Sequence, residues 1–320
     1  MFNARVAVTC LLTTALLGAT ATAHAQGADR PAPSGAADRP WHLSRIAPDG
    51  LPADGGKDVD VYVVDSGIRA THSEFGGRIA PGYNTAPDKP ENDSGDCAGH
   101  GTFVASLIAG KTYGVAKAAT VHPVRVMDCN NAWKDDNQVV KGIDWVTAQV
   151  KQKLKEPGAR TPIVNLSLES SGSDPAPVLD QALARLVDAG AIVVDIAGNF
   201  GRGDCLNSPK DPRAITAAAT DRDDYRNYAL NASSYGPCVT VFAPGAGITA
   251  ASHEGDAKTI GPWSGTSFAA PLIVGALALG VQKHPRLTMA QAKQFITETA
   301  YPGALHEIGK GSPNLLLHIT

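Results

Sequence analysis

Residues 59–67 read Val-Asp-Val-Tyr-Val-Val-Asp-Ser-Gly, a short and mostly apolar β-branched run that ends in an aspartate, a serine and a glycine. A run of this kind is typical of a strand buried on both faces of a sheet. Similar runs occupy residues 121–126, 162–168 and 191–197, and each is followed by turn or polar residues. We therefore predict that residues 59–64 and these three segments are strands of one buried sheet.

Between these runs, apolar residues recur at steps of three and four. One such series extends from Val139 to Leu154 and another from Leu179 to Val187. This spacing predicts amphipathic helices. Strands that alternate with helices predict an α/β fold, with a mainly parallel sheet covered by helices on both faces. Ligands are then expected at the carboxyl ends of the strands.

The composition is that of a packed globular protein. The chain has 320 residues, of which 43% are hydrophobic and 18% charged, and its 33 glycines and 22 prolines are spread along the sequence. These values exclude a disordered, collagen-like or coiled-coil protein. The formal net charge of −3, without any run of Lys or Arg, argues against nucleic acid as a partner.

The first 25 residues have the layout of a secretory signal peptide. Arg5 precedes an uncharged stretch over residues 6–23, and Ala23-His24-Ala25 places small residues at −3 and −1 of a cleavage site. Threonines interrupt the stretch, which argues against a stable membrane anchor. Residues 26–40, rich in Ala, Gly, Pro, Asp and Arg, are predicted to be a flexible leader. We expect secretion, to the periplasm or the extracellular space.

Cysteines are the expected covalent links of an exported protein. Of the five in the chain, Cys10 lies in the predicted signal peptide, so four remain and three pairings are possible. Pairing of nearest neighbours gives two disulfides. Free buried thiols and a zinc site are the alternatives, although no Cys-x-x-Cys spacing supports zinc. The two predicted disulfides are Cys97–Cys129 and Cys205–Cys238.

Three reactive side chains stand where a strand or a turn meets a helix. Asp65 ends the first run, His100 lies between two glycines before an apolar stretch, and Ser267 begins a stretch of small residues. Taken singly, the Asp and the Ser are compatible with helix or turn caps, and the His with a satisfied core residue. Together, the order Asp, His, Ser is one of the known chain orders of a catalytic triad.

With these motifs the chain resembles the subtilisin-like serine proteases, or subtilases, and among them the proteinase K branch. The resemblance extends from residues 40–46 through residues 164–168 and 197–199 to the segment around Ser267. It implies a subtilisin-like three-layer fold and a single peptidase domain over residues 41–320. The residues between the signal peptide and this domain are too few for the inhibitory pro-domain that members of the family usually carry.

The resemblance implies a serine endopeptidase that works through an acyl-enzyme on Ser267. His100 would accept the hydroxyl proton, and Asp65 would hold the imidazole in the correct tautomer. The Asn199 side chain and the Ser267 backbone N–H would bind the oxyanion. The expected partners are protein or peptide substrates, the expected state is a monomer, and no cofactor is required for the reaction.

The resemblance also implies a substrate-binding edge and a first specificity pocket. Members of the family usually carry two glycines where Glu169 and Ser170 stand here, and a small apolar residue where Asp195 stands. The two carboxylates motivate the hypothesis of a preference for a basic residue before the cleaved bond, although Asp195 is also compatible with a paired carboxylate behind the sheet. The predicted substrate-binding residues are Ser167, Leu168, Glu169, Ser170, Ala197 and Gly198.

Calcium is common in this family and would have a structural role. A carboxylate that proteinase K uses for calcium aligns with Thr240, which puts that site in doubt. Asp221, Asp223 and Asp224 form an acidic cluster, but such a cluster is usually a solvated loop. No metal site is therefore assigned.

Two other functions are compatible with parts of the sequence. A catalytically silent subtilase-like protein that binds peptides or a partner is the alternative, because of Glu169, Asp195 and the short leader. An α/β-hydrolase esterase requires Gly-x-Ser-x-Gly and the order Ser, Asp, His. Ser267 lies in Gly-Thr-Ser-Phe-Ala and comes last, so the esterase is set aside.

Overall fold

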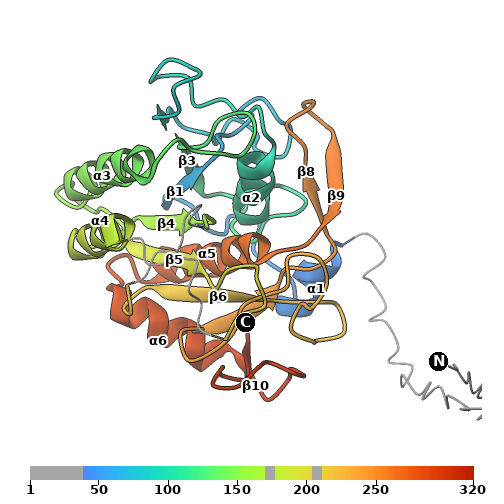
Figure 1. Cartoon of the computed structure of the whole chain (residues 1–320). Helices are drawn as coiled ribbons and strands as arrows, with labels where there is room; N and C mark the ends of the chain where they lie inside the picture. Colours follow the sequence, from blue (N-terminus) through green and yellow to red (C-terminus); the bar gives the residue numbers. More distant parts are fainter. Residues whose placement is uncertain (1–38, 170–176, 204–210) are drawn as a thin grey trace, which may run out of the picture. The chain divides into compact units, whose positions relative to one another are not determined.

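The computed structural model describes residues 39–169, 177–203 and 211–320, which include a nine-stranded sheet flanked by helices (Figure 1). The residues from Asp38 onward form one compact unit. The predicted signal peptide and nearly all of the predicted leader lie outside the described residues. Both stay predictions.

The sheet has the order β10-β11-β7-β6-β5-β4-β1-β3-β2. All its neighbouring pairs are parallel except β10 and β11. The four predicted strands are β1, β3, β4 and β5, and their limits agree with the prediction to within two residues. The strands are β1 (Asp60–Asp65), β2 (Tyr83–Asn84), β3 (Thr120–Arg125), β4 (Ile163–Leu166), β5 (Ile192–Ile196), β6 (Ile215–Thr220), β7 (Val241–Pro244), β10 (Tyr301–Pro302) and β11 (Leu315–Leu316).

Helices cover both faces of the sheet, as the alternation in the sequence predicts. Helices α2 and α5 pack together on one face, while α3 and α4 pack together on the other, and both α2 and α3 contact β1 and β3. The fold class is therefore confirmed. The helices are α1 (Trp41–Ile46), α2 (His100–Ala109), α3 (Asp136–Lys153), α4 (Pro177–Asp188), α5 (Thr266–Lys283) and α6 (Met289–Thr299), and a separate hairpin joins β8 (Ile248–Ala251) to β9 (Thr259–Trp263).

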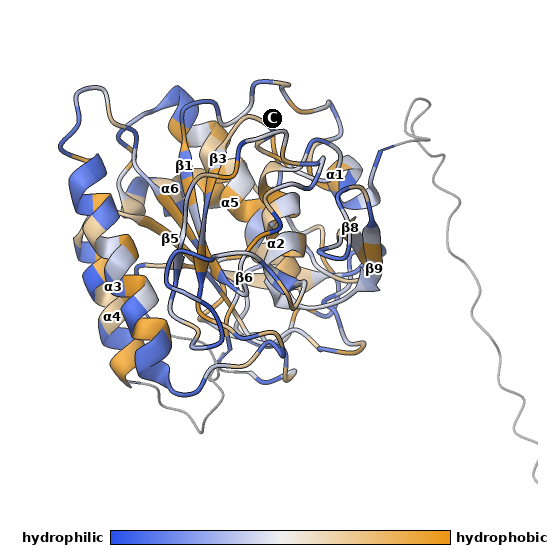
Figure 2. Cartoon of the chain, turned by 90° about the horizontal axis from the view of Figure 1, so that it is seen from above, coloured by the Kyte–Doolittle hydropathy of each residue, from blue (hydrophilic) through white to orange (hydrophobic). Residues whose placement is uncertain are grey.

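The core lies between the sheet and its helices. Strand β5 is buried along its whole length, and α5 is buried at nearly every position. In Figure 2, α5 carries mostly hydrophobic colour, whereas α3 and α4 carry both colours, as amphipathic surface helices do. Helix α5 is the one helix of the described chain that is long and apolar enough to cross a membrane, but 89% of it is buried inside the fold. It is therefore a core helix.

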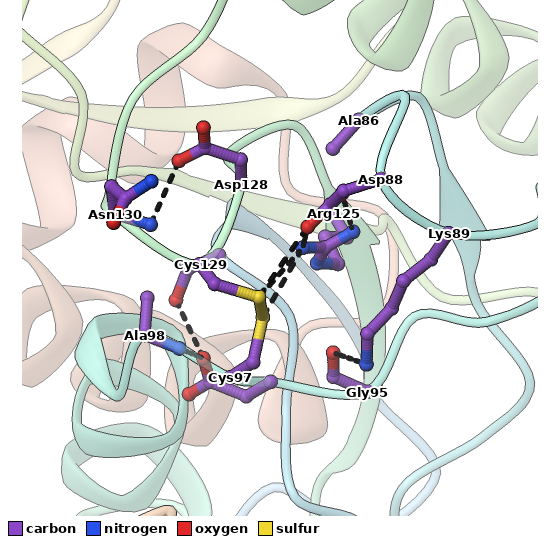
Figure 3. The surroundings of a disulfide bond; sticks show 12 residues. Ala86, Asp88, Lys89, Gly95, Cys97, Ala98, Arg125, Asp128, Cys129 and Asn130 are labelled. Carbon is purple, nitrogen blue, oxygen red and sulfur yellow. Dashed lines mark hydrogen bonds and ion pairs between the residues drawn. A yellow bond between two sulfur atoms is a disulfide. The ribbon is translucent and has the colours of Figure 1, made fainter.

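One of the two predicted disulfides is confirmed. Cys97, in the loop before α2, is bonded to Cys129, in the loop after β3, and the two are separated by 32 residues (Figure 3). Beside it, the buried Arg125 guanidinium donates to both carboxylate oxygens of Asp88 at 2.7 Å and lies 3.3 Å from the Cys97 sulfur. Cys205 lies outside the described residues, so its pairing with Cys238 stays a prediction.

Candidate active site

Asp65 and His100 meet at the carboxyl end of β1. Asp65 is the last residue of this strand, and His100 is the first residue of α2. The His100 Nδ1 lies 2.8 Å from Asp65 Oδ1 and 3.0 Å from Oδ2. The carboxylate has no exposed surface, while 19% of the imidazole surface remains accessible. Two of the three predicted triad residues are therefore in hydrogen-bond contact.

Gly101 allows this approach between the strand end and the helix. A Cβ atom at this position would lie only 2.1 Å from the Gly67 carbonyl oxygen and 3.2 Å from the Asp65 Cβ. The Gly101 N–H instead donates to the Ser66 hydroxyl at 2.9 Å. The glycine after His100 is thus required by close backbone packing.

Asp96 holds the first turn of α2 and was not predicted as a site residue. Its Oδ1 accepts from the backbone N–H groups of Ala98 and Gly99 at 2.9 and 2.8 Å, and from the Ser66 hydroxyl at 3.0 Å. Its Oδ2 accepts from the Thr102 N–H at 2.9 Å and from the Thr102 hydroxyl at 2.5 Å. An Asp just before an apolar helix is the signal that could have revealed this cap.

The electrostatic environment favours a charged His100. Burial by itself disfavours the imidazolium, but the charge and hydrogen bond of Asp65 and the charge of Asp96 outweigh it, so the pKa of His100 is raised above its ordinary value. A site with this property stabilises the imidazolium that forms when the ring accepts a proton.

Ser267 is the second residue of α5, and an unusual hydrogen bond fixes its backbone. Pro271 stands four residues later and has no N–H to donate to the Ser267 carbonyl. The Ser167 hydroxyl, which follows β4, donates to this carbonyl at 3.0 Å. Asn165 Nδ2 in turn donates to the Ser167 oxygen at 2.9 Å. The end of β4 therefore supplies the bond that proline removes from the helix.

Asn199 follows β5 and is oriented by the residue before Ser267. Its side-chain oxygen accepts from the Thr266 N–H at 2.7 Å and from the Thr266 hydroxyl at 3.0 Å. Because the oxygen is engaged in this way, the Nδ2 group is left as the donor. The backbone N–H of Asn199 donates to Glu169 Oε1.

These side chains line one cleft with a volume of about 460 Å³. Ser267 is 7% exposed within it, and no hydrogen bond joins its hydroxyl to His100 in the described part of the chain. The Phe268 ring packs beside the imidazole, with 5.7 Å between ring centroids. Residues of the cleft include His100, Ser167, Glu169, Asn199, Ser267 and Phe268.

Comparison with known proteins agrees with this arrangement. The model of the subtilase family, Peptidase_S8, matches residues 56–311, which is most of the chain.

The chain belongs to the subtilase family.

Similar proteins carry protease names. An extracellular serine proteinase of Thermus sp. (strain Rt41A) is 42% identical over 87% of this chain and 65% of its own length. An alkaline serine exoprotease A of Vibrio alginolyticus is 35% identical over 87% of this chain and 50% of its own length. The chain thus spans between half and two thirds of these relatives. The crystal structure of a cold-adapted subtilisin-like serine proteinase matches with a TM-score of 0.76 and 34% identity, over 88% of this chain and 99% of the solved one.

The predicted substrate edge of this subtilase is only partly on the cleft surface. Ser167 and Glu169 line the cleft. Leu168 and Ala197 are buried, with 2% and 0% of their surface exposed, and neither lines the cleft. Gly198 faces Glu169, because a Cβ there would lie 3.0 Å from Glu169 Oε1. Ser170 lies outside the described residues.

Asp195 does not charge the cleft of this subtilase, so that part of the hypothesis is wrong. Its side chain is buried behind the site, where the charge of Lys293 acts on it. Burial raises the pKa of Asp195 to about 8. The strand alternates its side chains between faces, and Asp195 belongs to the face turned away from the substrate.

Two of the three acids in the cluster at residues 221–224, to which no metal was assigned, already have protein partners. Asp221 Oδ1 accepts from the N–H groups of Asp223 and Tyr225 at 3.0 and 2.9 Å. Asp224 accepts two hydrogen bonds from Arg45, at 2.7 and 2.9 Å. In the described ranges, the one group of potential ligands close enough for a metal is Asp88 with the Cys97 and Cys129 sulfurs, which are bonded to each other.

Proposed function

We propose that this subtilase is a secreted serine endopeptidase that hydrolyses peptide bonds. The observation that carries the proposal is that His100, hydrogen-bonded to the buried Asp65, lines the same cleft as Ser267. The protease names of its relatives support the activity, and the name of the Thermus relative supports an extracellular location. The Cys97–Cys129 disulfide is consistent with an oxidising compartment.

In the acylation step, the Ser267 hydroxyl attacks the carbonyl carbon of the scissile bond and His100 Nε2 takes its proton. Asp65 accepts the hydrogen bond from Nδ1–H and stabilises the imidazolium. His100 then gives the proton to the leaving amine, and the acyl group stays on Ser267. In the second half, water attacks the ester while His100 acts as base, which restores the serine.

The negative oxygen of each tetrahedral intermediate needs donors that are already in place. The Asn199 side chain, held by Thr266, supplies one. The Ser267 backbone N–H supplies the other, because the first N–H groups of a helix have no partner inside the helix. Loss of the side-chain donor raises the barrier by roughly 3–4 kcal/mol.

The reaction as proposed uses groups of one chain. Proton transfer comes from His100, and charge stabilisation comes from Asp65 and Asn199, so no cofactor and no second subunit enter the chemistry. We therefore propose a monomer that acts on protein or peptide substrates. Calcium, if bound, would have a structural role outside these steps.

Casein digestion and labelling by a fluorophosphonate probe test the proposal. Wild-type protein should digest casein and bind the probe, and Ser267→Ala should do neither, with at least a ~10³-fold loss of rate. Ser44→Ala, on α1, is the control and should match wild type. A folded wild type that neither cuts casein nor reacts with the probe would instead support the catalytically silent alternative.

A further inference from the structure

Glu169 places an unbalanced carboxylate in the cleft. It lines the same cavity as Ser267, and it accepts a hydrogen bond from the backbone N–H of Asn199. No Lys or Arg of the described residues forms an ion pair with it or contributes to its electrostatic environment. Among the described residues, the acidic group therefore faces the substrate site without a cation.

A carboxylate in this position is costly for the protein. Burial raises the pKa of Glu169, and hydrogen bonding to Asn199 offsets this effect only in part. A buried charge without an opposite charge is unfavourable, whereas a charge-assisted hydrogen bond to an ammonium or guanidinium is strong. The described residues supply no such partner, and a cationic substrate side chain in the cleft would supply one.

Glu169 also lies against the residue that the oxyanion needs. Its carboxylate is bound to the Asn199 backbone N–H, while the Asn199 side-chain oxygen is fixed by Thr266 and the Nδ2 group is left for the tetrahedral intermediate. A negative oxygen at Nδ2 is therefore disfavoured by like-charge repulsion as long as the Glu169 charge is unpaired.

The opposite wall leaves room for this side chain. Gly198 has a backbone φ of +96°, and a Cβ at that position would come within 3.0 Å of Glu169 Oε1. Asp195 is buried away from the cleft, so Glu169 is the acidic group that substrate meets here.

We propose that Glu169 selects substrates with Lys or Arg immediately before the cleaved bond, and that the ion pair with this side chain removes the repulsion between Glu169 and the oxyanion at Asn199. The inference rests on the proposed endopeptidase function. The second part of the proposal has a kinetic consequence. A substrate with a neutral side chain leaves the Glu169 charge unpaired beside the oxyanion, so it loses kcat as well as binding.

Peptide amides that differ only in the residue before the cut test the proposal. With Arg, Lys, Leu and Phe at this position, wild type should favour Arg and Lys by about 100-fold in kcat/KM. Glu169→Gln should lose most of this preference. Glu169→Gly should lose it too and should gain kcat on the Leu and Phe peptides. Glu156→Gln, an exposed acid with the same change of net charge, is the matched control and should keep the wild-type preference.

A measurement on wild type alone covers the case in which the variants fail to fold. Benzamidinium should slow fluorophosphonate labelling of Ser267, and neutral benzamide at the same concentration should not. Equal cleavage of all four peptides, or equal effects of the two compounds, overturns the role of Glu169 while the labelling itself still supports a protease. Absence of labelling and of all cleavage defeats the endopeptidase proposal itself.

Discussion

Asp65 and Asp96 both act on His100, the first through contact and the second through charge. Asp65 accepts a hydrogen bond from His100 Nδ1, whereas Asp96 accepts hydrogen bonds from backbone N–H groups in the first turn of α2, which begins with His100. Both raise the pKa of the imidazole against the effect of burial. Catalysis requires the neutral imidazole as the initial base, so activity rises as pH increases through this raised pKa.

Replacement of Asp96 by Asn should move the low-pH limb of kcat/KM to lower pH. The substitution removes a negative charge that favours the imidazolium, so His100 loses its proton at a lower pH than in wild type. The measurement is the pH profile of kcat/KM for wild type and Asp96→Asn on one peptide. Asp93→Asn, in the same loop and paired with Lys89, is the control and should leave the limb in place. A limb that stays put or moves to higher pH in folded Asp96→Asn contradicts the assignment.

The residues of the site differ in how well the sequence alone predicts them. Asp65, His100 and Ser267 each lie in a short motif, and their order along the chain suffices to group them. Asp96 and Thr266 act through hydrogen bonds to backbone and to a distant side chain, respectively. The partner of Thr266 is Asn199, far away along the chain, so no local pattern reveals it.

At the scale of elements, the end of β4 and the start of α5 behave as one unit. The Ser267 carbonyl would be bonded by the residue at position 271 in an uninterrupted helix, but Pro271 cannot donate. Ser167 fills this role from another element, with Asn165 behind it. The position of the nucleophile is thus tied to the sheet, not to its own helix alone.

Removal of the Ser167 hydroxyl should destabilise the protein in a way that Pro271→Ala repairs. Ser167→Ala leaves the Ser267 carbonyl without a donor, which should lower the free energy of unfolding by about 1–3 kcal/mol. In the double variant, the new N–H at position 271 can donate to this carbonyl. Urea unfolding of the two single variants and the double variant measures the coupling.

Pro271→Ala alone is the matched control for this pair. Its carbonyl partner is already bonded by Ser167, so its effect should be smaller than that of Ser167→Ala. Additive losses in the double variant would show that position 271 does not restore the bond. Fluorophosphonate labelling of the same proteins reports whether the nucleophile keeps its position.

At the scale of the whole molecule, four strands of the sheet were predicted from sequence, whereas the interior strands β6 and β7 and the short strands β2, β10 and β11 were not. Strands β1, β3, β4 and β5 are buried β-branched runs, and their limits were nearly correct. Strands β2, β10 and β11 have two residues each, which is too short for any periodicity. Their pairing depends on distant segments, as with Leu316 beside Phe242. Such strands follow from the tertiary fold.

The Cys97–Cys129 disulfide should contribute to global stability far more than to chemistry. It closes a loop with a sequence separation of 32 residues, for which chain entropy gives about 3–4 kcal/mol. His100 at the start of α2 and Asp65 at the end of β1 are in direct hydrogen-bond contact, and neither cysteine of the disulfide takes part in it. The Cys97→Ser/Cys129→Ser variant should therefore unfold at lower urea concentration, while its kcat at urea concentrations well below the unfolding transition stays within a few fold of wild type.

Arg125 should keep its two hydrogen bonds to Asp88 in the variant, which would preserve the local loop arrangement. Unchanged unfolding, or loss of activity in a variant that is still folded, would contradict this division between stability and catalysis.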